Sequence, residues 1–204
     1  MGRPRAISID VETPERLLAA AEEVFAKDGL DKAALHDIAA RAGITRAALL
    51  YHFATKETLY QAVVGRAFAS LGEIVRSAIA GDAARPTASF RERLRAVVDG
   101  FLTYVSVHPA LARIVVREVI SEGGGGRALV LAGGVPLLDD VVGFLEREGG
   151  GQVARGVPVR AALMLIVSDV FLRSAAGDVR EALWGRGDHA WLFAQSVLLA
   201  KETA

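Results

Sequence analysis

Side chains that could neutralise phosphate groups are concentrated in one short stretch of the chain. Between Asp37 and Glu57 there is no acidic residue, but there are three basic ones, Arg41, Arg46 and Lys56. The full chain carries 24 basic and 24 acidic residues, so its overall charge cannot attract a polyanion. Binding to nucleic acid would therefore depend on this local patch.

The first residues of the chain have the same chemistry. Arg3 and Arg5 flank Pro4, and no acid occurs among the first nine residues. We predict that residues 1–10 form a flexible basic arm whose guanidinium groups reach a narrow minor groove of DNA, where the negative potential is strongest. The alternative interpretation is a tail that carries two stray charges.

Side chains for covalent or metal chemistry are scarce. The chain has no cysteine, which excludes disulfides and thiolate metal sites. Its four histidines, at positions 36, 52, 108 and 189, lack the spacing of metal ligands. No nucleophile-elbow, phosphate-loop or zinc-protease motif occurs. We therefore predict no catalytic residue, no cofactor and no metal, and we expect that the protein is not an enzyme.

Composition indicates a globular protein. Apolar residues make up 52% of the 204 residues. The longest fully apolar run covers residues 161–167, which is far short of the roughly 20 residues that a membrane span needs, and the chain begins without the apolar segment of a signal peptide. We expect a cytoplasmic protein without a membrane partner.

The elements that must position the basic patch are helices. Apolar residues recur at helical spacing throughout, and no two-residue alternation persists. This pattern predicts an all-α fold of about nine helices, with glycine-rich linkers at 123–126 and 149–151 and a helix at 127–148 that kinks, or begins afresh near Val135, because of Pro136. The predicted helices cover residues 14–28, 35–42, 46–52, 56–80, 90–107, 110–121, 127–148, 157–176 and 188–201.

Residues 34–53 have the spacing of a helix-turn-helix. Two short helices meet at Gly43, and Thr45 can cap the second one. In this motif the second helix enters the major groove and its first turns meet the base edges. The other interpretation is a solvated helical hairpin, because chance matches to this pattern are common.

Several stretches together form a recognisable pattern. They are residues 38–45 (Ile-Ala-Ala-Arg-Ala-Gly-Ile-Thr), residues 49–59 (Leu-Leu-Tyr-His-Phe-Ala-Thr-Lys-Glu-Thr-Leu), residues 20–25 (Ala-Ala-Glu-Glu-Val-Phe) and Gly29. Together they resemble the TetR family of transcriptional regulators, also called AcrR. The resemblance implies a three-helix DNA-binding domain at 11–71 and a helical ligand-binding and dimerisation domain at 72–204. It also implies a homodimer that represses transcription and releases double-stranded operator DNA when a small molecule binds.

The resemblance also places residues at the DNA. Lys56, at the start of a long helix, would contact a phosphate with help from that helix's dipole. With the arm included, the predicted DNA-binding residues are Arg3, Arg5, Thr45, Arg46, Ala47, Ala48, Tyr51, His52 and Lys56.

This sequence departs from the family pattern at several of these positions. Ala33 and Ala34 stand where the family often has hydroxyl residues that cap the second helix and touch phosphate, and Leu50 replaces a common tyrosine. Ala47 and Ala48 also replace a common glycine and a common polar residue. We expect fewer phosphate contacts, with recognition relying on Arg46 and on alanine methyl groups.

The remaining two-thirds of the chain indicate two apolar surfaces. The helix at 159–176 is apolar on nearly all sides, which predicts one face toward a core or pocket and another toward a second subunit. An apolar or aromatic ligand with one or two polar anchors would fit such a pocket. The predicted pocket residues are Phe68, Phe101, Tyr104, Leu111, Val115, Leu138, Met164 and Phe171. The predicted dimer-interface residues are Leu165, Leu172, Trp191, Val197 and Leu198.

Each prediction has a plainer alternative. The pocket residues could be ordinary core, and the apolar helices could belong to one large monomer core. For the whole protein, the rival hypothesis is a helical small-molecule carrier or enzyme whose helix-turn-helix is only structural. A carrier would bind an apolar ligand but would lack DNA binding that weakens with salt.

Overall fold

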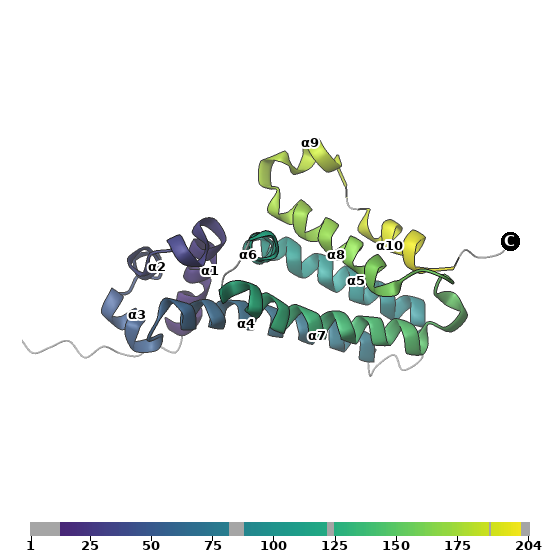
Figure 1. The fold of residues 1–204 in the computed structure, drawn as a ribbon, viewed down its shortest axis with the longest axis horizontal. Coiled ribbons are helices and arrows are strands. Elements are labelled where there is room, and N and C mark those ends of the chain that lie inside the picture. Colours follow the sequence, from purple (N-terminus) through teal and green to yellow (C-terminus); the bar gives the residue numbers. More distant parts are fainter. Residues whose placement is uncertain (1–12, 82–87, 122–124, 188, 201–204) are drawn as a thin grey trace, which may run out of the picture. The chain divides into compact units, whose positions relative to one another are not determined.

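The protein is all-α, as the sequence predicts. The structure, a computed structural model, describes residues 13–81, 88–121, 125–187 and 189–200, and this part contains ten α-helices and no named β-strand (Figure 1). The predicted arm with Arg3 and Arg5 lies outside the described residues. The helices are α1 (Thr13–Lys32), α2 (Leu35–Arg41), α3 (Arg46–His52), α4 (Lys56–Ala80), α5 (Phe90–Val107), α6 (Pro109–Ile120), α7 (Gly125–Glu148), α8 (Val159–Ala175), α9 (Arg180–Trp184) and α10 (Ala190–Leu198).

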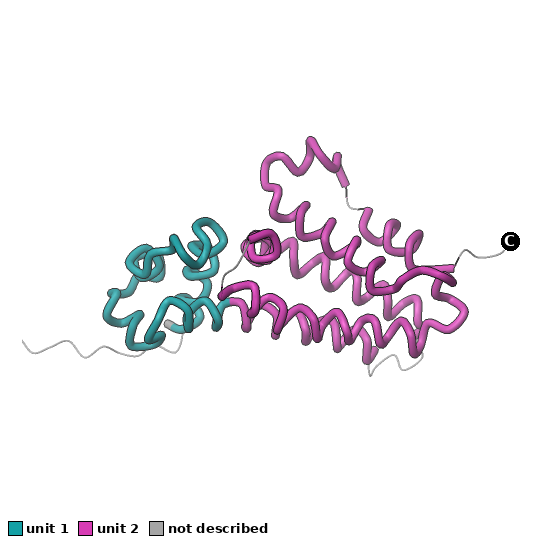
Figure 2. The backbone as a smooth tube through the Cα atoms, in the orientation of Figure 1, with its two compact units in different colours: residues 1–63 teal, residues 64–204 magenta. Residues whose placement is uncertain are grey.

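The chain divides into two compact units, residues 1–63 and residues 64–204 (Figure 2). The division falls inside α4, which contributes its first turns to the smaller unit and the rest to the larger. The smaller unit therefore contains α1, α2, α3 and the start of α4.

The smaller unit has its own core. Leu17, Ile38 and Leu49 have no exposed surface, and the ring of Phe25 packs edge-on against Tyr60 with centroids 4.9 Å apart. Side chains from four helices meet in this cluster, so each short helix is held by tertiary packing. Short helices need such support because they are marginal in isolation.

In the larger unit, the sequence signals for helix starts act as expected. Ser89 and Glu92 form a reciprocal capping box at the start of α5. Pro109 occupies the first turn of α6, where its missing N–H has no intrahelical partner to lose. Asp169 and Arg173 on α8 pair, as their four-residue spacing suggests.

One of the two alternatives predicted for the α7 segment, a helix that begins afresh near Val135, was wrong, because α7 continues through Pro136. The predicted glycine linker was wrong at Gly125 and Gly126, which form the first turn of α7, while Gly123 and Gly124 lie outside the described residues. Both Pro136 and Ala132, whose carbonyl loses its intrahelical donor, are exposed, so water can take the place of that donor.

By length and composition, α7 is also the one described helix that could cross a membrane. A single helix of this kind is weak evidence, because a helix facing an apolar interior has the same composition. Several apolar residues of α7, among them Val130, Leu138 and Val141, line the apolar cavity described below. The cavity accounts for the apolar composition of α7 within the larger unit.

The sequence pattern also missed the short helix α9. It has only five residues, too few for an apolar period to be visible. Its end is attached to α8 through the indole Nε1 of Trp184, which donates a hydrogen bond of 2.9 Å to Asp169. A contact between residues fifteen positions apart leaves no local trace in the sequence.

Candidate nucleic-acid interface and internal cavity

Helix α3 presents one face outward because its opposite face is anchored. Leu49 has no exposed surface and fixes the inner side of the helix. Thr45 caps the start, since its hydroxyl oxygen accepts a hydrogen bond of 3.1 Å from the backbone N–H of Ala48. The cap and the anchor together set the rotation of α3 about its axis.

The outward face of α3 carries most of the residues predicted to meet DNA. Arg46, Ala47 and Tyr51 are exposed, and 77% of the surface of Tyr51 is accessible. Ala48 and His52 are half-buried, and the His52 ring stands edge-on to Tyr51 with centroids 5.6 Å apart. This face offers a guanidinium, methyl groups and an aromatic hydroxyl, which are groups that read base edges or bind phosphates.

The turn between α2 and α3 is fixed by a glycine and by an arginine from α1. Gly43 has a φ of +69°, a left-handed conformation that favours glycine at a helix end. The guanidinium of Arg16 donates a hydrogen bond of 2.9 Å to the Ala42 carbonyl at the end of α2. This bond ties α1 to the turn, although the sequence pattern does not identify Arg16.

Lys56 has a structural contact besides its predicted phosphate contact. Its Nζ donates hydrogen bonds to the carbonyls of Asp31, at 2.8 Å, and Ala33, at 3.3 Å. These acceptors lie at and just beyond the end of α1, where a cation is favourable. An ammonium group has three donors. A phosphate could therefore accept the third N–H without breaking the other two bonds.

The start of α2 lacks the side-chain cap that α3 and α5 have. Ala34 occupies the cap position with extended backbone angles, and no side-chain hydrogen bond forms there. Changing Ala34→Ser should raise the free energy of unfolding by about 1 kcal/mol, because the serine oxygen can accept a hydrogen bond from an unpaired N–H of the first turn. Chemical denaturation measures this gain, and anisotropy with duplex DNA measures any added phosphate contact.

Ala40→Ser is the matched control. Ala40 is exposed in the last turn of the same helix, where serine is a poorer helix former than alanine and no free N–H awaits a cap. Ala40→Ser should not stabilise the protein. Equal effects of the two substitutions would contradict the capping argument.

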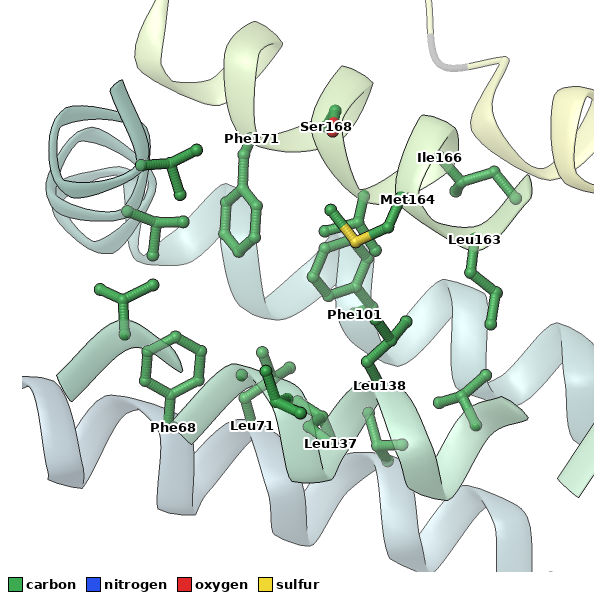
Figure 3. Close-up of a pocket in the computed structure, with 18 of the residues that line it drawn as sticks. Phe68, Leu71, Phe101, Leu137, Leu138, Leu163, Met164, Ile166, Ser168 and Phe171 are labelled. Carbon is green, nitrogen blue, oxygen red and sulfur yellow. The ribbon is translucent and has the colours of Figure 1, made fainter. Parts of the chain in front are cut away.

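The larger unit contains a cavity of about 380 Å³ that is partly open to solvent, since lining residues such as Val119 and Ile120 are exposed (Figure 3). Residues from α4, α5, α6, α7, α8 and α10 line it, and the only polar side chain among them is that of Ser168. In Figure 3, Phe68 extends from α4 and Phe171 from α8, on opposite walls. Phe171 packs edge-on against Phe101, with ring centroids 5.6 Å apart.

Of the eight predicted pocket residues, the structure brings six together in this lining: Phe68, Phe101, Val115, Leu138, Met164 and Phe171.

Two predicted pocket residues lie elsewhere. Tyr104 does not line the cavity, because its hydroxyl donates a hydrogen bond of 2.9 Å to the Ala67 carbonyl and its ring is buried. Leu111 is also absent from the lining and has only 1% of its surface exposed, as a packed core residue has. Both side chains belong to the packed interior beside the cavity.

Sequence reasoning also missed a large part of the lining. Leu94, Val97, Val98 and Leu102 stand at helical spacing on α5 and are visible in the sequence as one apolar face. That spacing indicates a buried face, but it does not distinguish a packed core from a cavity wall. The missed residues are Leu71, Val75, Leu94, Val97, Val98, Leu102, Val116, Val119, Ile120, Val130, Leu131, Gly134, Val135, Leu137, Val141, Leu163, Ile166, Val167, Ser168, Leu172 and Leu198.

The residues predicted for a subunit interface divide into two groups. Leu165 is 60% exposed and Leu172 is 48% exposed on α8, while Trp191 and Val197 on α10 are half-buried. Leu198 has no exposed surface and lines the cavity, so it cannot contact a second subunit directly.

Two further apolar residues on α10, Leu192 and Phe193, are 64% and 40% exposed. Exposed apolar residues thus occur on both helices predicted to pair. An apolar surface of this kind commonly marks an interaction site.

Comparison with protein families agrees with this geometry. Residues 17–63 match the family model described as bacterial regulatory proteins, tetR family. The chain is 30% identical over 154 residues to the HTH-type transcriptional activator FasR of Mycolicibacterium smegmatis, an alignment that covers 76% of this chain and 68% of FasR. It is 36% identical over 92 residues to the HTH-type transcriptional repressor BepR of Brucella suis, and this match spans less than half of either protein, 45% of this chain and 44% of BepR.

Solved structures share the fold over nearly the whole chain. One is the transcriptional regulator FadR of Bacillus subtilis in complex with stearoyl-CoA. It superposes with a TM-score of 0.64 at 19% identity and covers 90% of this chain and 94% of its own. At this identity the likeness concerns the fold.

Proposed function

Because this chain belongs to the TetR family of bacterial transcriptional regulators, we propose that it is a homodimeric, ligand-responsive repressor. It binds operator DNA through α3 and releases that DNA when an apolar effector occupies the cavity of the larger unit. The protein acts in the cytoplasm, where the DNA is. The observation that carries this proposal is the combination of an exposed α3 face with an apolar cavity in one chain.

The DNA-binding part rests on chemistry at α3. Arg46 can donate two hydrogen bonds to a guanine, and the methyl groups of Ala47 and Ala48 can contact a thymine methyl. Tyr51 and Lys56 remain available for phosphates, which fix the position of the helix on the duplex. The predicted arm with Arg3 and Arg5 adds minor-groove contacts.

The dimer part rests on the exposed apolar residues of α8 and α10. Pairing these two helices with their copies across a two-fold axis would form a four-helix interface and remove Leu165, Leu172 and Phe193 from water. A two-fold protein would read a palindromic operator whose half-sites lie about 34 Å apart, one turn of DNA.

The effector part rests on the composition of the cavity. Among the described residues of its lining there is no charged side chain and one hydroxyl, that of Ser168, so a charged group inside would lose its hydration without a partner. An uncharged apolar chain or ring with one polar anchor fits best. The FadR complex with stearoyl-CoA supports only the apolar-chain part of this proposal, because that related fold holds a ligand with a long apolar chain, whose CoA group is charged.

Release of DNA would follow from a shift between two states. The effector lowers operator affinity only to the extent that it binds the DNA-free state more tightly. Conversely, operator DNA must weaken effector binding by the same factor.

Fluorescence anisotropy with DNA from upstream of its own gene tests the proposal. The protein should prefer this DNA over a scrambled duplex, and the affinity should fall steeply as salt rises, because phosphate contacts release counterions. If no operator occurs there, selection from random duplexes should still enrich a palindrome. A protein that enriches no sequence and shows no salt-dependent binding would contradict the proposal and favour a carrier.

A reporter gene placed behind the selected operator tests the direction of regulation. Repression predicts higher expression when the gene for this regulator is deleted. Lower expression after deletion would instead indicate an activator, as the relative FasR is.

A further inference from the structure

Two adjacent glycines, Gly133 and Gly134, lie in the middle of α7 beside Phe68 of α4. Neither has a positive φ, so the backbone conformation does not require glycine at either position. Glycine is also among the poorest helix formers. Its presence here therefore calls for another reason, and close packing is the one that the structure offers.

At Gly133 that reason is visible in the contacts. A Cβ atom built on Gly133 would lie 2.5 Å from Cδ2, 2.6 Å from Cγ and 2.8 Å from Cβ of Phe68. Because the Cβ of Phe68 is bonded directly to the α4 backbone, rotating the ring cannot relieve the whole overlap. An alanine at 133 would have to displace the ring and separate α7 from α4.

Gly134 differs from Gly133 in this respect. Its added Cβ would lie 3.5 Å from Cε1 and 3.7 Å from Cζ of Phe68, which are ordinary van der Waals distances. The steric restriction is therefore specific to position 133.

The restriction matters because Phe68 is part of the cavity wall. Its side chain extends from α4 beside α7 at one end of the cavity, on the wall opposite Phe171 (Figure 3). Only 8% of Phe68 is exposed, so little solvent-filled space is available into which its ring could move. A displaced ring would instead take up cavity volume.

We propose that Gly133 determines effector size, by allowing the Phe68 ring to pack against α7 as an end wall of the cavity. The inference rests on the proposed function, since it treats the cavity as the effector site. It assigns Gly133 a positioning role, through Phe68, and assigns Phe68 the contact with the end of the ligand.

The test uses the full-length chain and four variants: Gly133→Ala, Phe68→Ala, the double variant and Gly143→Ala. Gly143→Ala is the control, because Gly143 is on the same helix but outside the cavity lining, and its added Cβ would overlap only the mobile end of Arg147. The probe is N-phenyl-1-naphthylamine, an uncharged apolar fluorophore, displaced by straight-chain alcohols from octanol to hexadecanol. Thermal unfolding is recorded for each protein.

We expect Gly133→Ala to bind the fluorophore about tenfold more weakly and to melt at a lower temperature, as overpacking requires. The control should bind like wild type and melt no lower. In the Phe68→Ala background, Gly133→Ala should lower the melting temperature less than it does in the wild type, because the two ring contacts are gone and only the contact with the Cβ of residue 68, at 2.8 Å, remains. Each added methylene should strengthen alcohol binding about fourfold until the chain meets the wall, and Phe68→Ala should move that limit to longer alcohols.

Equal behaviour of Gly133→Ala and the control, or an unchanged chain-length limit in Phe68→Ala, would overturn the inference while leaving the effector cavity in place. Failure of every protein, wild type included, to bind the fluorophore and the alcohols would refute the effector cavity itself and the size limit with it. In that case, a Gly133→Ala effect on the melting temperature that depends on the residue at 68 would show only that the two residues pack together.

Discussion

Leu165→Arg is expected to convert the dimer into a monomer and to weaken operator binding by at least about a hundredfold. Leu165 is 60% exposed in the single chain, so the arginine costs little in folding. In the proposed four-helix interface, each copy would place one such charge in an apolar contact, where it lacks a partner. A monomer also loses the gain in affinity from holding two recognition helices on one DNA.

Sedimentation or light scattering measures the oligomeric state, and anisotropy measures binding to the full palindrome and to a half-site. The half-site affinity should change little, which separates loss of dimerisation from loss of the DNA-binding surface. Val107→Arg is the matched control, since Val107 is 68% exposed and belongs to α5, which is not one of the two helices proposed to pair. A Leu165→Arg protein that remains dimeric would exclude this part of α8 from the interface.

Arg46→Ala is expected to reduce the preference for operator over scrambled DNA by about thirtyfold or more. A bidentate arginine–guanine contact contributes about 1–3 kcal/mol, and a dimer makes it at two half-sites. Arg46 is exposed on α3 and forms no ion pair with another residue that the structure describes, so its loss should leave the melting temperature unchanged. Competition anisotropy with operator and scrambled duplexes measures the ratio directly.

Two further variants identify the cause. Arg46→Lys keeps the charge but not the planar pair of donors, so it should retain most of the salt dependence and lose most of the preference. Arg155→Ala removes an exposed charge from the larger unit. It should leave the salt dependence and the preference for operator unchanged. If Arg46→Ala weakened binding equally to every sequence, Arg46 would be a phosphate contact and not a base contact.

The sequence by itself determined the local architecture of the smaller unit. Gly43 and Thr45 act through hydrogen bonds and backbone angles within a few positions along the chain, so their effects on the turn and on the start of α3 are visible without a fold. The absence of a cap at Ala34 could be recognised for the same reason. Apolar residues on nearly all sides of the α8 segment likewise indicated from the sequence alone that the helix has two buried faces.

The tertiary structure decided which apolar side chains face empty space. Phe101 and Tyr104 stand three positions apart on α5, yet only Phe101 lines the cavity. The hydroxyl of Tyr104 instead donates a hydrogen bond to the Ala67 carbonyl of α4. Leu198 likewise is buried through its contact with distant helices. Helical spacing identifies a buried face, but whether that face meets atoms or a cavity depends on the closeness of helices far apart in sequence. At Gly133 and Phe68, that closeness depends on a single missing methyl group.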